Sequence, residues 1–178
     1  MQTESFLKLV AVEQLAKHHA RGPFDCGIES LNRYLIQLSG QYERRHLSRT
    51  YVATLPPNSR VVGYYSISSA QVDYTRVSLK QFPRHPTGIP LPCALIGKLA
   101  VDREYQKRGM GQHLLLHALR NVKRVSDQIA ISAVLIHAID ETAKRFYEQY
   151  GFRSLSEQNN EYDLVLGIKA VKRIFSDE

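Results

Sequence analysis

An apolar strand, a basic glycine-containing turn and a helix follow one another over residues 99–116, and this stretch constrains the fold most. Residues 99–101 are typical of the end of a buried strand. Gly109 and Gly111 remove two Cβ atoms where the backbone must approach another group closely. The first N–H groups of the following helix have no partner within that helix, and with the helix dipole they favour an anion. The stretch therefore predicts a backbone site for the phosphates of a cofactor.

The spacing of the glycines excludes two common phosphate-binding loops. No Gly-x-x-x-x-Gly-Lys-Ser/Thr occurs, so a P-loop is not supported. No Gly-x-Gly-x-x-Gly with a later acidic residue occurs, so a dinucleotide-binding fold is not expected. What remains is Gln-x-x-Gly-x-Gly, from Gln106 to Gly111, directly after Leu-Ala-Val.

Length and cysteine content point to one ordinary globular domain. A chain of 178 residues can bury a sizeable core, so we expect a single domain over residues 1–178. No apolar run approaches about 18 residues, and the N-terminus lacks a basic region followed by an apolar stretch. Neither a membrane span nor a signal peptide is therefore expected. Cys26 and Cys93 are too few for a disulfide framework, which favours reduced thiols in a cytoplasmic protein.

The charge of the chain favours polyanionic partners, because its formal net charge is +7. The basic residues gather in three clusters, one of which surrounds the glycine turn. A phosphorylated cofactor accounts for part of this charge, and a solvated basic surface is the alternative. The clusters are Arg44, Arg45, His46 and Arg49; Lys98, Arg103, Lys107 and Arg108; and Arg120, Lys123 and Arg124.

Apolar periodicity alternates between strands and helices along the chain. We expect strands over residues 6–12, 49–55, 61–69, 93–101, 129–138, 152–155 and 162–168. Helices are expected after a cap at Ser30, over residues 109–125, and from an N-cap at Asp140 to a stop at Gly151. The proline-rich residues 73–92 are typical of a long surface connection. The order predicts an α/β fold with a mixed sheet of about six to seven strands and helices on both faces.

Several separated segments resemble one protein family. The segment from Gln106 to Gly111 resembles the pyrophosphate loop of the Gcn5-related N-acetyltransferases (GNAT), which bind acetyl-coenzyme A (acetyl-CoA). Further segments indicate one branch of this family: residues 24–27 with 30–35, residues 49–52 with 62–68, residues 97–102 with 106–111, and residues 143–152. Together they are similar to the acetyltransferase toxins of bacterial type II toxin–antitoxin systems, over nearly the whole chain.

The resemblance implies a reaction and partners. Toxins of this branch transfer acetyl from acetyl-CoA to the α-amino group of aminoacyl-tRNA, and the blocked amine cannot form a peptide bond. A small ribbon-helix-helix antitoxin and a homodimer are also implied. The basic clusters fit a tRNA substrate, because phosphate contacts supply much of the affinity for nucleic acids.

The resemblance also implies roles for particular residues. Tyr147 would protonate the departing thiolate of coenzyme A, whereas periodicity alone favours a core tyrosine beside Phe146. A tyrosine hydroxyl near pKa ~10 is close enough to a thiol in basicity for this step. For Asp140, a role as a helix cap is an equal alternative. The cofactor-binding residues would be Leu99, Ala100, Val101, Gln106, Lys107, Arg108, Gly109, Met110, Gly111, Gln112, Asp140, Ala143 and Phe146. The tRNA-binding residues would be Arg44, Arg45, Arg49, Lys98, Arg103 and Lys107.

No general base can be named from the sequence. Many relatives place a glutamate on the strand before the pyrophosphate loop, but here that strand, residues 94–101, contains no carboxylate, and the first one after it is Asp102. The pKa of an α-amine is ~7.7–8.0 against ~10.4 for lysine, so the departure favours an α-amine acceptor. The seven histidines, His137 among them, show no metal-ligand spacing and are interpreted as surface or packing residues.

Two alternatives stay open. The chain could be an N-acetyltransferase acting on a protein or small-molecule amine. It could also be a non-catalytic nucleic-acid-binding module with a vestigial cofactor site.

Overall fold

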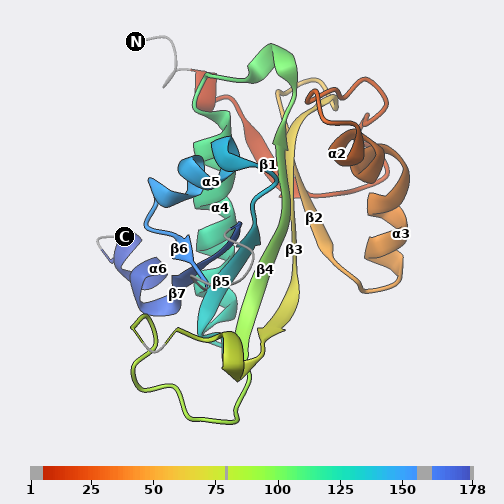
Figure 1. The fold of residues 1–178 in the computed structure, drawn as a ribbon. Coiled ribbons are helices and arrows are strands. Elements are labelled where there is room, and N and C mark those ends of the chain that lie inside the picture. The colour runs from red at the N-terminus through yellow and green to blue at the C-terminus, as the bar shows by residue number, and fades with distance from the viewer. Residues whose placement is uncertain (1–5, 79, 156–161, 177–178) are drawn as a thin grey trace. The chain divides into compact units, whose positions relative to one another are not determined.

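The computed structural model describes residues 6–78, 80–155 and 162–176 and has an α/β fold (Figure 1). Its seven strands form one mixed sheet in the order β1-β2-β3-β4-β5-β7-β6, which confirms the expected fold class. The strands are β1 Ala11–Gln14, β2 Arg49–Thr54, β3 Val61–Val72, β4 Leu91–Val101, β5 Ala133–His137, β6 Arg153–Ser154 and β7 Asp163–Gly167. The helices are α2 Glu29–Arg33, α3 Ser39–Arg44, α4 Met110–Val125, α5 Glu141–Glu148 and α6 Ile168–Ile174.

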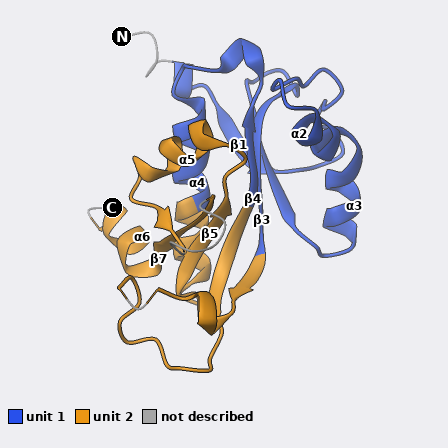
Figure 2. Cartoon of the chain, in the orientation of Figure 1, with its two compact units in different colours: residues 1–68, 97–118 blue, residues 69–96, 119–178 orange. Residues whose placement is uncertain are grey.

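The chain divides into two compact units (Figure 2). The first unit comprises residues 1–68 and 97–118, and the second comprises residues 69–96 and 119–178. β3, β4 and α4 each contribute residues to both units. No helix in the described ranges is long and apolar enough to span a membrane.

Helices pack on both faces of the strands in the first unit. On β3, the Tyr64 ring stacks on Tyr34 with centroids 5.9 Å apart, and its hydroxyl donates to the Leu31 carbonyl of α2 at 2.9 Å. Gly63 points the other way, because successive strand residues face opposite sides of a sheet. A Cβ at Gly63 would lie 2.9 Å from Leu114 of α4. The prediction of helices on both faces is therefore confirmed for this unit.

The helical segment that begins at α2 contains one wide turn. α2 passes into a π-helix at Tyr34–Leu38, which passes directly into α3. The Ser39 hydroxyl supports this turn by donating to the Leu35 carbonyl at 2.6 Å. The predicted apolar stripe packs on the core of this unit, as expected; it comprises Leu31, Tyr34, Leu35, Leu38 and Tyr42.

The second unit is built on the parallel pair β4–β5. The register runs from Cys93 opposite Ala133 to Ile96 opposite Ile136, and β7 continues the sheet antiparallel to β5. One face of these strands is covered by the connection that follows β3, through a 3₁₀ helix at Tyr74–Arg76. Val77 and Phe82 from this connection pack with the core cluster on that face.

Three local predictions are wrong, and one helix was not predicted. The first strand begins at Ala11, because the Leu9 N–H bonds to the Phe6 carbonyl and closes a helical turn before it. Ser30 lies inside α2 and caps nothing, since the N-cap is Ile28. β5 begins at Ala133 instead of residue 129, because the Ile129 N–H still bonds to the carbonyl of Val125 in α4 at 3.0 Å. α6 follows β7 directly, with no side-chain cap to announce it.

Candidate functional site

The turn between β4 and α4 holds two residues in the left-handed region, Lys107 with φ 59° and Gly109 with φ 77°. A lysine there costs roughly 1–2 kcal/mol relative to the right-handed region, so its surroundings must hold it in place. Left-handed residues in a turn create concavities of N–H groups that bind anions. α4 begins at Met110, directly after this turn. The local geometry fits the predicted phosphate site.

A buried aspartate, Asp102, supports the turn from the end of β4. Its Oδ1 accepts from the Glu104 N–H at 3.1 Å and caps a 3₁₀ helix at Arg103–Tyr105. Its Oδ2 accepts from the Asp25 N–H at 3.2 Å and from Arg60 at 3.4 Å. Asp102 is only 2% exposed. Both of its oxygens are engaged in holding backbone, so this carboxylate is placed for a structural role.

The side chain of Gln106 joins this turn to the segment before α2. Its Nε2 donates to the Val101 carbonyl at 2.9 Å and to the Cys26 carbonyl at 3.0 Å. The sequence predicted a backbone role for Gln106 and missed this structural one. The backbone role stays a prediction.

The neighbouring motif Phe24–Gly27 is fixed by the same turn. Asp25 forms an ion pair with Arg103 at 3.1 Å. A hydrogen bond from Asn32, helped by the Gly27 N–H and the charge of Arg103, holds the pKa of Asp25 below its ordinary value. Gly27 has φ 90°, and a Cβ there would lie 2.9 Å from the Arg103 side chain. The residues of the Phe24–Gly27 motif are therefore explained by the structure, because Asp25 and Gly27 both contact Arg103.

β4 continues beyond its pairing with β5. The last paired residues are Ile96 and Ile136, whereas β4 extends to Val101. In the described part of the chain, residues 97–101 therefore have no partner on β5. An extended ligand with amide groups can pair with such an edge as an added strand would. This geometry fits the predicted contacts of Leu99, Ala100 and Val101.

Three of the predicted tRNA contacts lie at α3 and the start of β2. Arg44 and Arg45 are exposed at the end of α3. Arg49 is held by Glu43, whose Oε2 lies 2.9 Å from its Nη1. Arg44 and Arg45 thus carry the more available charges of this group.

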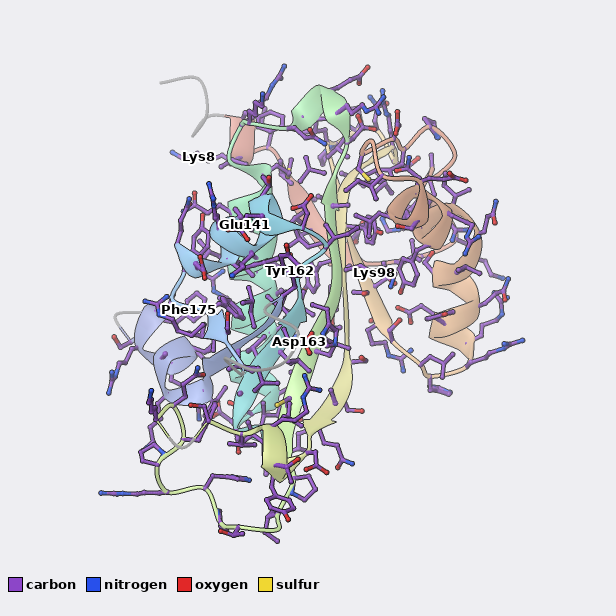
Figure 3. All side chains as sticks on the ribbon, in the orientation of Figure 1. Lys8, Lys98, Glu141, Tyr162, Asp163 and Phe175 are labelled. Carbon is purple, nitrogen blue, oxygen red and sulfur yellow. The ribbon has the colours of Figure 1, made fainter. Side chains whose placement is uncertain are left out.

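The other three predicted contacts lie on or after β4, also in the first unit. Lys98 is half-buried, with Nζ 4.6 Å from the centre of the Tyr34 ring (Figure 3). Burial lowers the pKa of Lys98. Arg103 is paired with Asp25, and Lys107 is exposed in the turn. The structure places all six candidates in one unit without joining them into one contact cluster.

Tyr147 lies on α5 in the second unit and is 7% exposed. Its ring packs against Phe146 and Phe152, with centroids 5.1 and 5.8 Å away. Within the described residues its hydroxyl makes no hydrogen bond. Burial raises the pKa of Tyr147, so it lies further above that of a thiol than the sequence suggested. The hydroxyl is therefore a persistent hydrogen-bond donor, better suited to stabilising a thiolate than to giving up its proton outright.

The geometry at the start of α5 supports the interpretation of Asp140 as a helix cap. Asp140 Oδ1 accepts from the Ala143 N–H at 2.7 Å, as an N-cap does. Phe146 belongs to the aromatic cluster, and its ring also contacts Tyr150. The roles of Asp140, Ala143 and Phe146 at a cofactor stay predictions.

Sequence reasoning missed a histidine–aspartate pair at the end of β5. His137 Nδ1 lies 2.6 Å from Asp163 Oδ1, and the two residues are opposite each other in the β5–β7 ladder. The other carboxylate oxygen of Asp163 accepts from Arg76. Burial alone would raise the pKa of Asp163, but the hydrogen bonds from His137 and Arg76 lower it. No local spacing could have revealed this pair, because its members are 26 residues apart.

One group in the described chain has metal-ligand composition: Glu13, His18 and His19. His19 Nδ1 accepts from the Ala16 N–H at 2.9 Å, and its Nε2 lies 3.0 Å from Glu13. A neutral imidazole with an accepting Nδ1 carries its proton on Nε2 and donates it. With its proton on Nε2, His19 has no lone pair left to bind a metal. We therefore interpret His19 and Glu13 as a hydrogen-bonded pair with His18 beside it, and not as a metal site.

Comparison with protein families and known proteins gives consistent matches. Residues 46–154 match the acetyltransferase (GNAT) domain family. A tRNA-acetylating toxin of Mycobacterium tuberculosis is 33% identical over 129 residues, covering 72% of this chain and 75% of that protein. The probable toxin TacT of Sinorhizobium fredii is 28% identical over 144 residues, covering 77% and 80%.

Solved structures match over nearly the whole chain. A tyrosine-to-phenylalanine mutant of KacT has a TM-score of 0.87 and 27% identity, covering 94% of this chain and 99% of that one. AtaT complexed with acetyl-methionyl-tRNAfMet has a TM-score of 0.85 and 28% identity, covering 93% and 99%. A mutant AtaT bound to the C-terminus of the antitoxin AtaR and acetyl-CoA has a TM-score of 0.79 and 26% identity, covering 94% and 98%.

Proposed function

Since the chain belongs to the GNAT acetyltransferase family, we propose that it transfers acetyl from acetyl-CoA to the α-amino group of aminoacyl-tRNA and so blocks translation. The observation that carries this proposal is the similarity to a tRNA-acetylating toxin and to AtaT complexed with acetyl-methionyl-tRNA. In both cases the similarity extends over most of this chain.

Acetyl-CoA, the acetyl donor of GNAT enzymes, fits the residues after β4. The unpaired edge at residues 97–101 suits the amides of pantetheine. The left-handed turn at Lys107 and Gly109 and the first turn of α4 suit the pyrophosphate. The exposed side chains of Lys107 and Arg108 add positive charge there. These residues bind and orient the donor and take no part in bond making.

The first unit offers the positive charge that a tRNA substrate requires. Arg44 and Arg45 are exposed, and they carry no described acidic partner in the way that Arg49 and Arg103 do. Contacts of this kind bind phosphates without regard to sequence, so they supply affinity and a strong dependence on salt.

Tyr147 is the proposed hydrogen-bond donor to the thiolate that leaves when acetyl is transferred. Its buried hydroxyl stays protonated and has no competing partner in the described chain. The KacT and AtaT structures include variants in which a tyrosine is replaced by phenylalanine, which is consistent with a functional tyrosine in these proteins.

The proposed biological setting is a toxin–antitoxin pair. KacT and AtaT have been solved with antitoxin or DNA, and we propose a ribbon-helix-helix antitoxin and a homodimer for this chain. Because three elements run through both compact units, we further propose that residues 1–178 form one domain. A charged tRNA substrate implies that the protein acts in the cytoplasm.

The test is the transfer of radiolabelled acetyl from acetyl-CoA to a pool of charged tRNA, with uncharged tRNA as the control. Label on the charged pool alone, released together with the amino acid by mild base, supports the proposal. Absence of label, while the protein still binds acetyl-CoA, would overturn it and direct the search to protein and small-molecule amines.

A further inference from the structure

The proposed reaction involves a proton at two atoms, the sulfur of coenzyme A and the nitrogen of the amine. Tyr147 serves the sulfur, and the nitrogen still requires a proton acceptor. When the amine attacks the acetyl carbon, a C–N bond forms and the C–S bond breaks. The sulfur gains a proton or a hydrogen bond, for which Tyr147 is available. The nitrogen must lose a proton. Asp102, the first carboxylate after β4, is buried, and both of its oxygens already accept hydrogen bonds from the protein.

His137 lies where a ligand of this fold is expected. It is the last residue of β5 and follows Ile136, at which pairing with β4 stops. Ligands of open α/β sheets bind beyond the carboxyl ends of parallel strands, and β4–β5 is the parallel pair described here. Three residues separate His137 from α5, the helix that carries Tyr147.

The hydrogen bond with Asp163 holds the neutral ring of His137 in one tautomer. Asp163 is 5% exposed and is anionic at neutral pH, because Arg76 and His137 both donate to it. An anion at 2.6 Å from Nδ1 requires a proton on Nδ1. The lone pair of a neutral His137 is then on Nε2. The side chain is 51% exposed, and Nε2 makes no hydrogen bond with the described residues, which leaves its lone pair available to a substrate.

We propose that His137 is the proton acceptor for the attacking amine and that Asp163 is the residue that positions it. The proposal rests on the proposed function. The neutral α-amine attacks, its nitrogen transfers one proton to Nε2 of His137, and the imidazolium passes that proton to solvent. The products are the N-acetylated aminoacyl-tRNA and the thiolate of coenzyme A, which holds a hydrogen bond from Tyr147 until solvent protonates it, and His137 returns to its neutral form. Asp163 keeps the ring oriented and stabilises the imidazolium, and it is not protonated itself.

The test replaces the imidazole and then supplies it from solution. In His137→Ala we expect kcat for acetylation of charged tRNA to fall by about 10²–10³, the usual range for general base catalysis. The affinity for acetyl-CoA should stay within about twofold of wild type, since His137 is not part of the donor site. Added imidazole should restore at least about tenfold of the lost rate. His18→Gln is the matched control, because His18 is exposed and lies beside a carboxylate at 3.7 Å.

The positioning role of Asp163 is tested by a double-mutant cycle. Asp163→Asn should lower kcat without changing KM, because an amide no longer requires the proton on Nδ1. In the double variant with His137→Ala, the second substitution should cost almost nothing further, since the two residues act as a unit. A merely structural Asp163 predicts additive losses, which would overturn this part of the proposal.

Other outcomes separate this proposal from the proposed function. A His137→Ala protein with kcat within about threefold of wild type overturns the base assignment, whatever the substrate. A wild-type protein that acetylates the α-amine of a peptide and not charged tRNA overturns the proposed substrate. A loss in His137→Ala with that peptide still supports the base. A wild type inactive on both amines overturns both.

Discussion

Two buried aspartates, Asp102 in the first unit and Asp163 in the second, are used for different purposes. Asp102 accepts from two backbone N–H groups and from Arg60, so it fixes the shape of a turn. Asp163 accepts from Arg76 and from the ring of His137, a side chain that remains half exposed. One carboxylate organises backbone, whereas the other organises a titratable group.

We propose that the residues after β4 and the residues at β5 and α5 divide the work of donor binding and turnover. The residues after β4 offer backbone geometry and fixed charge, which suit the binding of a phosphorylated donor. The residues at β5 and α5 offer a phenol that can donate a hydrogen bond to a thiolate and an imidazole that can accept a proton. Substitutions after β4 should therefore change binding constants, and substitutions at β5 and α5 should change turnover.

Tyr147→Phe should have the largest effect. We expect kcat to fall by about 10²–10⁴, with the affinity for acetyl-CoA unchanged. Folding should be preserved, since the hydroxyl makes no hydrogen bond within the described residues. Single-turnover acetylation measures the change, and Tyr150→Phe on the same aromatic cluster is the control. A rise in KM without a change in kcat would contradict the division of work.

Asp102→Asn should destabilise the first unit by about 3 kcal/mol, because it leaves Arg60 and two N–H groups with a weakened buried partner. Urea denaturation measures the loss. Asp73→Asn is a close control: Asp73 caps the 3₁₀ helix Tyr74–Arg76 in the same manner but is exposed. The control should lose under about 1 kcal/mol. Equal losses would show that burial of Asp102 is unimportant.

Gly109→Ala should weaken acetyl-CoA binding by about tenfold and leave kcat at saturation nearly unchanged. Alanine is strained at φ 77°, so the turn must shift away from the shape that binds phosphate. Isothermal titration with acetyl-CoA measures the effect. Gly88→Ala imposes similar strain at φ 82° in a loop of the second unit and has open space for its Cβ. It should leave acetyl-CoA affinity as it is.

Charge reversal at Arg44 and Arg45 should weaken tRNA binding several-fold and reduce its salt dependence. Each tRNA phosphate that the variant no longer neutralises lowers the slope of log K against log salt by roughly 0.7–0.9. Filter binding of tRNA at several salt concentrations measures this slope. Lys169→Glu on α6, exposed in the second unit, is the control. An equal loss with Lys169→Glu would show that only net charge matters.

The stability contributed by Asp163 should depend on pH in a defined direction. Its pKa is lowered in the folded protein, so its stabilising interactions are present at neutral pH. They are lost as pH falls below the unfolded value of about 3.9 and through the folded value. The Tm difference between the wild type and Asp163→Asn should therefore narrow as the pH falls below about 4. A difference that widens in acid would contradict the assigned charge.

Much of the fold could be predicted because local signals were strong. The start of α4 was predicted to within one residue, since Gly109 and the apolar face of the helix mark it clearly. Asp140 and Gly151 delimit α5 by capping chemistry that is local to the chain, and Gly151 has φ 89°. α6 carried no such signal, because it begins at Gly167 without a capping side chain.

The candidate site could be predicted only where it is continuous in sequence. The residues from Gln106 to Gln112 were found as a motif. The pair of His137 and Asp163 depends on strand register between β5 and β7, which no single segment reveals. Asp102 was noted only as the first carboxylate after the strand, and its structural role was not predicted, because its partners include residue 25 and residue 60.

The π-helix at Tyr34–Leu38 sets the rotational phase between two parts of one continuous helical segment. A π-turn accommodates one residue more than an α-turn, and one residue of an α-helix corresponds to about 100° of rotation. Removing a single residue from this turn would let the segment wind as a regular α-helix. If the Tyr34 ring stays on its core, Arg44 and Arg45 would then rotate by roughly that angle around the helix axis. The direction in which Arg44 and Arg45 face is therefore set by one extra residue in a turn that lies six to ten positions before Arg44.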